Sequence, residues 1–194
     1  MVMAEAGFGL DSGREQNLTT IREVMMQKFA WMAAGAALIL CSVADAEEIR
    51  VEMNKIDQTG VGESIGSIVA TDTAAGLKLA PDLKGLPSGP HGFHVHEFPD
   101  CGVKEKDGKA VPGLAASGHF DPDKSAKHAG PEGDGHAGDL PVLKVASDGT
   151  AKEAVTAKRL RLADLEKRSL MIHAEDDNYS DKPGGARMAC GAVK

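Results

Sequence analysis

Residues 92–97 read Gly92-Phe93-His94-Val95-His96-Glu97, which places two histidines two positions apart. If this stretch is a β-strand, the two side chains project from the same face, about 6.6 Å apart along the backbone. Both imidazoles can then reach one metal ion. Such a pair alone is weak evidence, because it also arises by chance on sheet surfaces, so the rest of the chain has to support a metal site.

The chain on both sides of this stretch has the pattern of short strands. Residues 48–57 (EIRVEMNKID) alternate apolar and charged side chains, as a half-buried strand does. The turn sequence Ser147-Asp148-Gly149 predicts a hairpin between its flanking apolar runs. After Ala46 only 162–167 could form a short helical turn. Short strands separated by turns favour an antiparallel sandwich or barrel. The predicted strands are 48–57, 64–71, 140–145, 154–157, 169–173 and 189–193.

Composition and charge restrict the class of protein. The chain has 194 residues, 42% hydrophobic and 26% charged, which is ordinary for a folded soluble protein. Aromatic residues are only 4%, so the core has to be built from aliphatic side chains and methionine. The formal net charge is -7 and no long basic run occurs, so we expect no nucleic-acid partner.

The first 46 residues are predicted to be an N-terminal extension followed by a secretory signal peptide. Residues 29–43 are apolar, Lys28 precedes them, and Ala44-Asp45-Ala46 has the small-x-small pattern of a cleavage site. The alternatives are a buried helix or a retained anchor, but the apolar run is short for a membrane span. Cleavage after Ala46 would leave a domain of residues 47–194 in the periplasm, with no membrane attachment.

Cleavage would also remove Cys41 and leave Cys101 and Cys190. Two lone cysteines in an oxidising compartment are expected to pair, and two buried free thiols are the alternative. Closing so long a loop would stabilise the fold by up to ~4.6 kcal/mol through chain entropy.

The stretch 100–138 is rich in glycine, proline and charge, and loops of that length are usually functional or disordered. Its histidines His119, His128 and His136, with Asp139, make a set that suits tetrahedral zinc. The alternative is a solvated polar loop with incidental histidines. An all-imidazole set on a strand suits copper instead. Six histidines and Asp139 exceed what one four-coordinate metal uses, so either two metals bind or several histidines are idle.

Four ordered motifs resemble those of the copper/zinc superoxide dismutases, and the match is closest to their exported bacterial branch. The resemblance covers essentially all of residues 48–194. The motifs are Gly92-Phe93-His94-Val95-His96-Glu97, Gly118-His119-Phe120-Asp121-Pro122, His136-Ala137-Gly138-Asp139-Leu140-Pro141 and Arg187-Met188-Ala189-Cys190-Gly191.

The resemblance implies an all-β fold, an eight-stranded antiparallel Greek-key barrel of immunoglobulin-like sandwich type, with two long functional loops. It implies one copper and one zinc per subunit, with the imidazolate of His119 bridging them. The implied copper ligands are His94, His96, His119 and His173. The implied zinc ligands are His119, His128, His136 and Asp139.

The resemblance also implies roles around the metals. Asp177 matches a carboxylate that hydrogen-bonds one copper and one zinc histidine, as outer carboxylates commonly do. Arg187 matches an anion-guiding arginine, and Cys101 and Cys190 match the intrachain disulfide. His91 matches a position that is not a ligand, so we predict a structural histidine. The loop 178–186 is short against relatives, which leaves the position of Arg187 open.

The implied reaction is the disproportionation of superoxide to dioxygen and hydrogen peroxide, with copper as the redox centre. In that reaction His119 takes up and returns a proton, and Arg187 holds the anion. The rival hypotheses are an exported non-enzymatic metal-binding or metal-buffering protein and a zinc hydrolase. Asp139, as a fourth zinc donor, argues against the hydrolase. Exported relatives include dimers and monomers, so a homodimer stays open.

Overall fold

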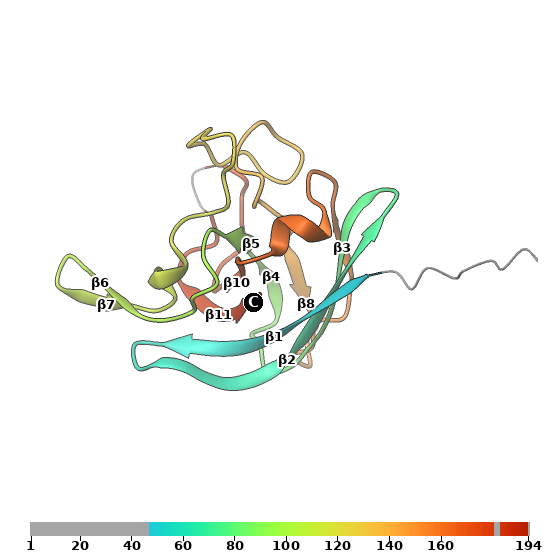
Figure 1. Cartoon of the computed structure of the whole chain (residues 1–194). Helices are drawn as coiled ribbons and strands as arrows, with labels where there is room; N and C mark the ends of the chain where they lie inside the picture. Colours follow the sequence, from blue (N-terminus) through green and yellow to red (C-terminus); the bar gives the residue numbers. More distant parts are fainter. Residues whose placement is uncertain (1–46, 181–182, 194) are drawn as a thin grey trace, which may run out of the picture. The chain divides into compact units, whose positions relative to one another are not determined.

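The computed structural model describes residues 47–180 and 183–193, so the predicted extension and signal peptide lie outside the described residues. Its main element is one antiparallel sheet (Figure 1). The strands of this sheet, in spatial order, are β5 (Phe93–His96), β10 (Ser169–His173), β11 (Arg187–Ala192), β1 (Glu48–Asp57), β2 (Gly60–Thr73), β3 (Gly76–Leu83) and β9 (Val155–Ala157).

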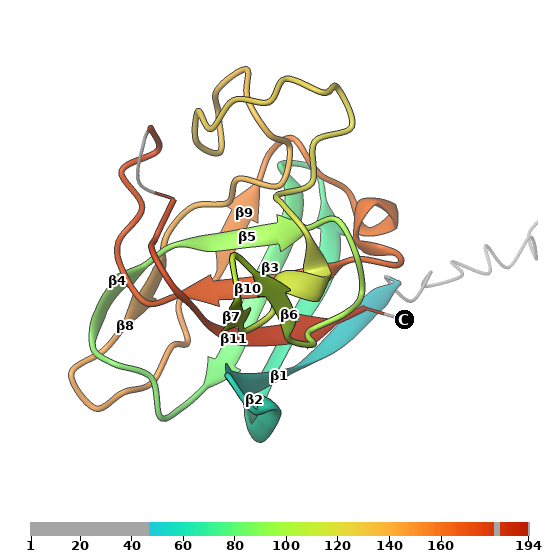
Figure 2. The same cartoon turned by 90° about the vertical axis from the view of Figure 1, so that its left-hand side faces the viewer.

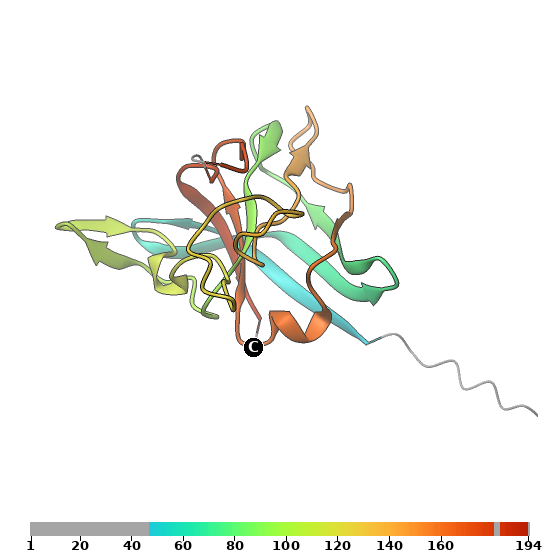
Figure 3. The ribbon, with the colours of Figure 1, turned by 90° about the horizontal axis from the view of Figure 1, so that it is seen from above.

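Two smaller antiparallel ribbons complete the strands. β4 (Gly89–His91) pairs with β8 (Leu143–Val145), and β6 (Lys104–Lys106) pairs with β7 (Lys109–Val111). The β6–β7 hairpin projects away from the main sheet at the left of Figure 1, and it extends to the left again in the view from above in Figure 3. Two short 3-10 helices, η1 (Leu114–Ala116) and η2 (Leu162–Leu165), lie in connections.

The predicted all-β antiparallel fold is confirmed. The eleven strands of the described residues reduce to eight when β6 and β7 are set apart and β4 and β5 are counted as one strand interrupted at Gly92. β4 leads directly into β5, and a turn joins β8 to β9, so the β4–β8 ribbon connects the two edge strands of the main sheet along the chain. The sheet therefore curls over one core (Figure 2).

The core is aliphatic, as the composition predicts. On β1 the apolar Val51 and Met53 are buried while the intervening Glu52 is exposed, which is the period-two pattern of a half-buried strand. β10 is buried along its whole length because it lies between β5 and β11. Phe93 is the one aromatic ring among the largest fully buried side chains of the described residues.

The sequence prediction was wrong in one pairing. The turn at Ser147-Asp148-Gly149 forms and is closed by a hydrogen bond from the Ala146 N–H to the Thr150 carbonyl, 2.8 Å long. The strands beyond it do not form a hairpin, because β8 pairs with β4 and β9 pairs with β3. Turn chemistry fixes the local reversal, but burial of each strand's apolar face selects its partner.

Other differences concern missed elements. β3 was not predicted, and it contains Pro81, which has no N–H to give to a ladder. Pro81 is tolerated because β9 pairs only with Leu77–Leu79 and leaves that part of the edge unpaired. The long stretch 100–138 also contains the β6–β7 hairpin and η1 rather than loop alone.

The predicted disulfide between Cys101 and Cys190 is present, with 5.7 Å between the two Cα atoms. It ties the segment after β5 to β11, and both cysteines are buried with Ile56, Ala116 and Met171. Over residues 47–180 and 183–193, no helix is long and apolar enough to cross a membrane.

Candidate metal centre

The two ends of the long loop are hydrogen-bonded to the outer edge of β5, the edge that does not pair with β10. The Phe120 N–H donates to the Val95 carbonyl over 2.8 Å, and the Val95 N–H donates to the Gly138 carbonyl over 2.9 Å. The Gly138 N–H in turn donates to the Phe120 carbonyl over 2.8 Å. Figure 2 shows the segment between these ends arching above β5. These bonds bring His119 and Asp139 beside the two strand histidines.

Gly138 is required by this close approach. A Cβ atom at this position would lie 2.3 Å from the Val95 carbonyl oxygen and 2.8 Å from the Phe120 nitrogen. Both atoms belong to backbone that is hydrogen-bonded in the three-way contact, so neither can move without breaking it. Glycine at position 138 thus lets the loop return to β5 just before Asp139.

Four histidines converge on one point on the face of the sheet that is turned away from the aliphatic core. His94, His96, His119 and His173 each offer a ring nitrogen, and these four atoms lie within 4.8 Å of one another. His94 and His96 come from β5, His173 from the end of β10, and His119 from the loop. β10 pairs with β5, so the three strand histidines are held by one ladder.

Hydrogen bonds fix which nitrogen of each strand ring faces the centre. His94 Nε2 lies 2.6 Å from Asp177 Oδ2, His96 Nδ1 lies 2.9 Å from the Ser117 carbonyl, and His173 Nδ1 lies 3.0 Å from the Gly185 carbonyl. Each partner can only accept, so each of these nitrogens carries the proton. The opposite nitrogens, His94 Nδ1, His96 Nε2 and His173 Nε2, are buried without a hydrogen-bond partner.

Burial keeps these imidazoles neutral. It lowers the pKa of His94 to about 3 and that of His173 to about 4, and it lowers the pKa of His96 well below its usual value. Neutral rings with inward lone pairs and outward N–H groups are what a bound transition metal requires. The unpaired lone pairs therefore fit a metal at this point, and an all-imidazole set suits copper.

A second cluster gathers around Asp139. His119 Nδ1 lies 2.8 Å from Asp139 Oδ1, and His128 Nδ1 lies 2.9 Å from Asp139 Oδ2. His94, His119, His128 and Asp139 offer ligand atoms within 4.8 Å of one another, so His94 and His119 both belong to both clusters. The pKa of Asp139 is lowered: burial opposes ionisation, but the hydrogen bond from His119 and the nearby imidazoles outweigh it.

His136 lies at the margin of this second cluster. Its Nδ1 is 3.5 Å from Asp139 Oδ1, and it is not among the donors that lie within 4.8 Å of one another. The same nitrogen is buried without a hydrogen-bond partner, as is His128 Nδ1. Arg159 donates to the carbonyls of Gly135 and His136 and holds this part of the loop. Three ring nitrogens near one carboxylate are a set of donor types that suits zinc.

Asp177 links the two clusters through hydrogen bonds to a histidine of each. Its carboxylate accepts from His94 Nε2 over 2.6 Å and from His128 Nε2 over 2.8 Å, and the backbone N–H of Tyr179 also donates to it. Burial favours the neutral acid, but these three hydrogen bonds outweigh it and hold the pKa of Asp177 far below its usual range. The carboxylate is therefore ionised and fixes the orientation of one ring in each cluster.

Arg187 stands beside the all-imidazole cluster. It is the cross-strand partner of His173, at a bulge between β10 and β11. Its guanidinium donates to the carbonyls of Gly113 and Ser117, each over 2.6 Å. Burial lowers the pKa of Arg187, but an arginine stays cationic at neutral pH. The structure thus places a fixed positive charge next to the copper-type cluster, although the 178–186 loop is short.

His91 is buried but belongs to neither donor set. Its Nδ1 lies 2.9 Å from the His173 carbonyl and its Nε2 lies 2.8 Å from the Pro87 carbonyl. Both ring nitrogens are thus engaged with backbone, as expected for a structural histidine.

Arg168, which was not predicted from the sequence, supports the centre through contacts to residues next to two of the donors. Its guanidinium lies 3.6 Å from the centroid of the Phe120 ring and donates to the carbonyl and carboxylate oxygens of Glu97. Phe120 follows His119 and Glu97 follows His96, so this one side chain contacts neighbours of two donors. Only its place five residues before His173, immediately before the same strand, could have signalled this role.

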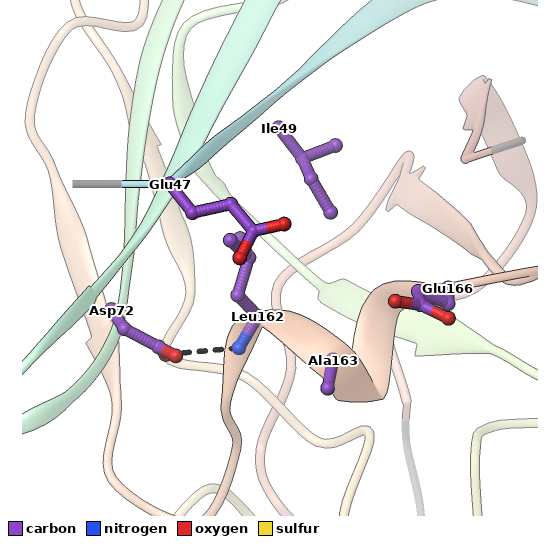
Figure 4. A pocket seen from close by; sticks show the side chains of 6 residues that line it. All are labelled: Glu47, Ile49, Asp72, Leu162, Ala163 and Glu166. Carbon is purple, nitrogen blue, oxygen red and sulfur yellow. Dashed lines mark hydrogen bonds between the residues drawn. The ribbon is translucent and has the colours of Figure 1, made fainter. Parts of the chain in front are cut away.

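A cavity of about 110 Å³ lies elsewhere and is acidic (Figure 4). The Leu162 N–H donates to Asp72 at its wall over 2.9 Å. None of the donor histidines lines this cavity, so it is not part of the metal centre. Its lining residues are Glu47, Ile49, Asp72, Leu162, Ala163 and Glu166.

Comparison with known proteins gives a consistent result. The family model described as copper/zinc superoxide dismutase matches residues 64–193. The Cu-Zn superoxide dismutase 2 of Salmonella typhimurium is 51% identical over 167 residues, covering 83% of this chain and 96% of the relative. The Cu-Zn superoxide dismutase of Escherichia coli K12 is 49% identical over 164 residues, covering 81% and 95%.

Solved structures agree with the sequences. The Cu/Zn superoxide dismutase from Brucella abortus superposes with a TM-score of 0.74 at 49% identity, covering 76% of this chain and all of the other. The copper, zinc superoxide dismutase from Salmonella enterica, described as monomeric, superposes with a TM-score of 0.70 at 51% identity. The similarity therefore extends over the whole fold and includes the region of both histidine clusters.

Proposed function

The chain belongs to the copper/zinc superoxide dismutase family, and on this premise we propose that it disproportionates superoxide to dioxygen and hydrogen peroxide. The observation that carries the proposal is the pair of donor clusters that share His94 and His119 and that contain buried ring nitrogens without hydrogen-bond partners. We assign copper to His94, His96, His119 and His173. We assign zinc to His119, His128, His136 and Asp139.

Copper held by these four histidines would supply one-electron redox chemistry, and zinc held by the second set would supply positive charge and tie the loop. The protein's own part begins with ligand orientation. The Ser117 and Gly185 carbonyls and the Asp177 carboxylate each hold one outward N–H, so the inward lone pairs of the three strand histidines need no rearrangement.

His119 is the residue that we assign to hold and deliver a proton. Its Nδ1 faces Asp139 at 2.8 Å, on the side assigned to zinc, so Nε2 is the nitrogen that would take up the proton when zinc occupies Nδ1. The side chain is 10% exposed, so the ring is not closed off from solvent. Peroxide formation consumes protons, so a fixed imidazole that takes up and releases one beside the anion assists the step.

Arg187 is assigned to bind the superoxide anion. Its guanidinium donates hydrogen bonds to two backbone carbonyl oxygens rather than to a carboxylate. Because these partners are uncharged, they do not neutralise the positive charge of Arg187. A cation fixed in this way next to the copper donors attracts a small anion and holds it there, although the chain as a whole is acidic.

The disulfide and the predicted signal peptide both bear on where in the cell the protein is located. Disulfides such as Cys101–Cys190 persist outside the reducing cytosol. Together with the signal-like residues 29–46, this supports export to the periplasm and a mature domain of residues 47–194. All proposed ligands come from one chain, and both a monomer and a homodimer are compatible with this assignment.

Metal analysis and a superoxide-decay assay on the mature chain separate this proposal from its rivals. The dismutase should bind one copper and one zinc per chain and remove superoxide catalytically. A metal-buffering protein would bind the metals without accelerating decay, and the names of the relatives do not favour that alternative. A zinc hydrolase would require zinc alone.

A further inference from the structure

Tyr179 lies next to the carboxylate that joins the two clusters. It is two residues after Asp177, and its backbone N–H donates to Asp177 Oδ1 over 2.7 Å. Its φ is 56°, in the left-handed region that non-glycine residues rarely adopt. The backbone at Tyr179 is therefore bent so that its N–H can meet the carboxylate.

The side chain of Tyr179 reaches across to the far end of the metal loop. Its hydroxyl oxygen accepts a hydrogen bond from the Val142 N–H over 2.9 Å. Val142 lies three residues after Asp139, just beyond the point where the loop rejoins β5. The bond links segments 37 residues apart in sequence, so it closes the loop against the Asp177 segment.

The ring of Tyr179 also lies against the middle of the same loop. A Cβ atom at Gly130 would lie 2.8 Å from both Cβ and Cγ of Tyr179. Gly130 is buried and has a φ of +74°. It is two residues after His128, so the ring packs on the loop two residues beyond the histidine that Asp177 orients on the zinc side.

We propose that Tyr179 is a positioning residue for the zinc half of the centre, an inference that rests on the proposed function. Its backbone fixes Asp177, its ring fixes the loop beside His128, and its hydroxyl fixes the chain after Asp139. Tyr179 touches no metal donor through its own side chain. It holds the loop closed around Asp177, so that His128 Nδ1 and Asp139 stay within reach of one ion.

Two substitutions test the two side-chain contacts separately. Tyr179→Phe keeps the ring and removes the oxygen that accepts from Val142. Gly130→Ala introduces the clash with the ring. Its matched control is Gly108→Ala, because Gly108 has a nearly identical φ of +72° but nothing within 4 Å of its would-be Cβ. Any difference between the two alanine variants therefore reports contact at Gly130, not backbone strain.

The decisive readout is zinc release from folded, metal-loaded protein to a chelating dye at neutral pH. We expect release to be about 3- to 10-fold faster in Tyr179→Phe, more than about 10-fold faster in Gly130→Ala, and unchanged in Gly108→Ala. The ¹H–¹⁵N signal of the His128 Nε2–H should also shift in both test variants, since its bond to Asp177 loosens. A purely structural tyrosine would lower the unfolding midpoint without altering either quantity.

The outcomes distinguish this inference from the proposed function. Wild-type protein that binds no zinc would overturn both. Wild-type protein that holds zinc, together with a Tyr179→Phe variant whose release rate and His128 signal are unchanged, would overturn the positioning role alone. Tyr179→Phe removes one oxygen atom and should fold, so this result is obtainable even if Gly130→Ala does not fold.

Discussion

Arg187 and His96 donate hydrogen bonds to one carbonyl oxygen, that of Ser117, over 2.6 and 2.9 Å. The proposed anion-binding charge and a proposed copper ligand are thus positioned by the same backbone atom. Ser117 has a φ of 66°, outside the common regions for a residue with a side chain, and this conformation directs its carbonyl toward both donors. The charge and the ligand should therefore move together when this segment is disturbed.

The first prediction concerns Arg187 itself. Arg187→Glu should lower the rate of superoxide removal by about tenfold or more, because it replaces attraction of an anion by repulsion. Arg187→Lys should lose much less, and metal content should be unchanged in both. The wild-type rate should also fall as salt is added, since salt screens the attraction.

The matched control is Arg50→Glu, which makes the same change of charge at an exposed strand position bonded only to Ser67. Equal effects of the two glutamate variants would show that net charge, not the place of Arg187, sets the rate. A wild-type rate that does not depend on salt would mean that the short 178–186 loop has removed the steering.

The second prediction is that the two clusters respond differently to loss of a donor. His173→Ala should abolish activity and leave zinc bound, because His173 belongs only to the all-imidazole cluster. His128→Ala or Asp139→Ala should weaken zinc binding by more than about tenfold, lower stability and keep some activity. His119→Ala should disturb both metals. Metal content by mass spectrometry checks each variant, and equal zinc loss in His173→Ala and His128→Ala would contradict the assignment.

The third prediction concerns the pH dependence of the metal-free protein. Burial lowers the pKa of His173 to about 4 and that of His94 to about 3, against an unfolded value near 6.5. The unfolded chain therefore binds more protons between these values, so stability falls as the pH drops from about 6.5 toward 4. The two rings together should make the free energy of unfolding lower by on the order of 4 kcal/mol at pH 5 than at pH 7.

Urea denaturation of the metal-free protein at several pH values measures this dependence. The variant His173→Phe, which cannot take up a proton, should show a smaller loss between pH 7 and pH 5. A metal-free protein equally stable at both values would mean that these rings are not held neutral by burial.

The fold class and the donor residues could be predicted from the sequence because both depend on local pattern. Alternation on 48–57 predicts β1, and the spacing of His94 and His96 predicts a shared face. The strand partners of 140–145 and 154–157 were beyond such reasoning, because pairing is decided by burial across the whole sheet. The Arg168 contact to Glu97, across 71 residues, is likewise a product of the tertiary fold alone.

The fourth prediction concerns maturation, in residues outside those that the structure describes. The chain's one tryptophan, Trp31, lies within the predicted signal peptide. Protein from an exported fraction should begin at Glu47 and should show tyrosine emission from Tyr179 without indole emission. Intact mass and selective excitation check both points. Indole emission together with a mass that includes residues 29–46 would indicate a retained anchor.

The most direct test of the central claim is the decay of superoxide in the presence of the mature chain loaded with copper and zinc. We expect each chain to remove many equivalents of superoxide, at a rate that is proportional to protein concentration and that disappears when copper alone is left out. Decay at the spontaneous rate, in protein shown to carry one copper and one zinc per chain, would contradict it.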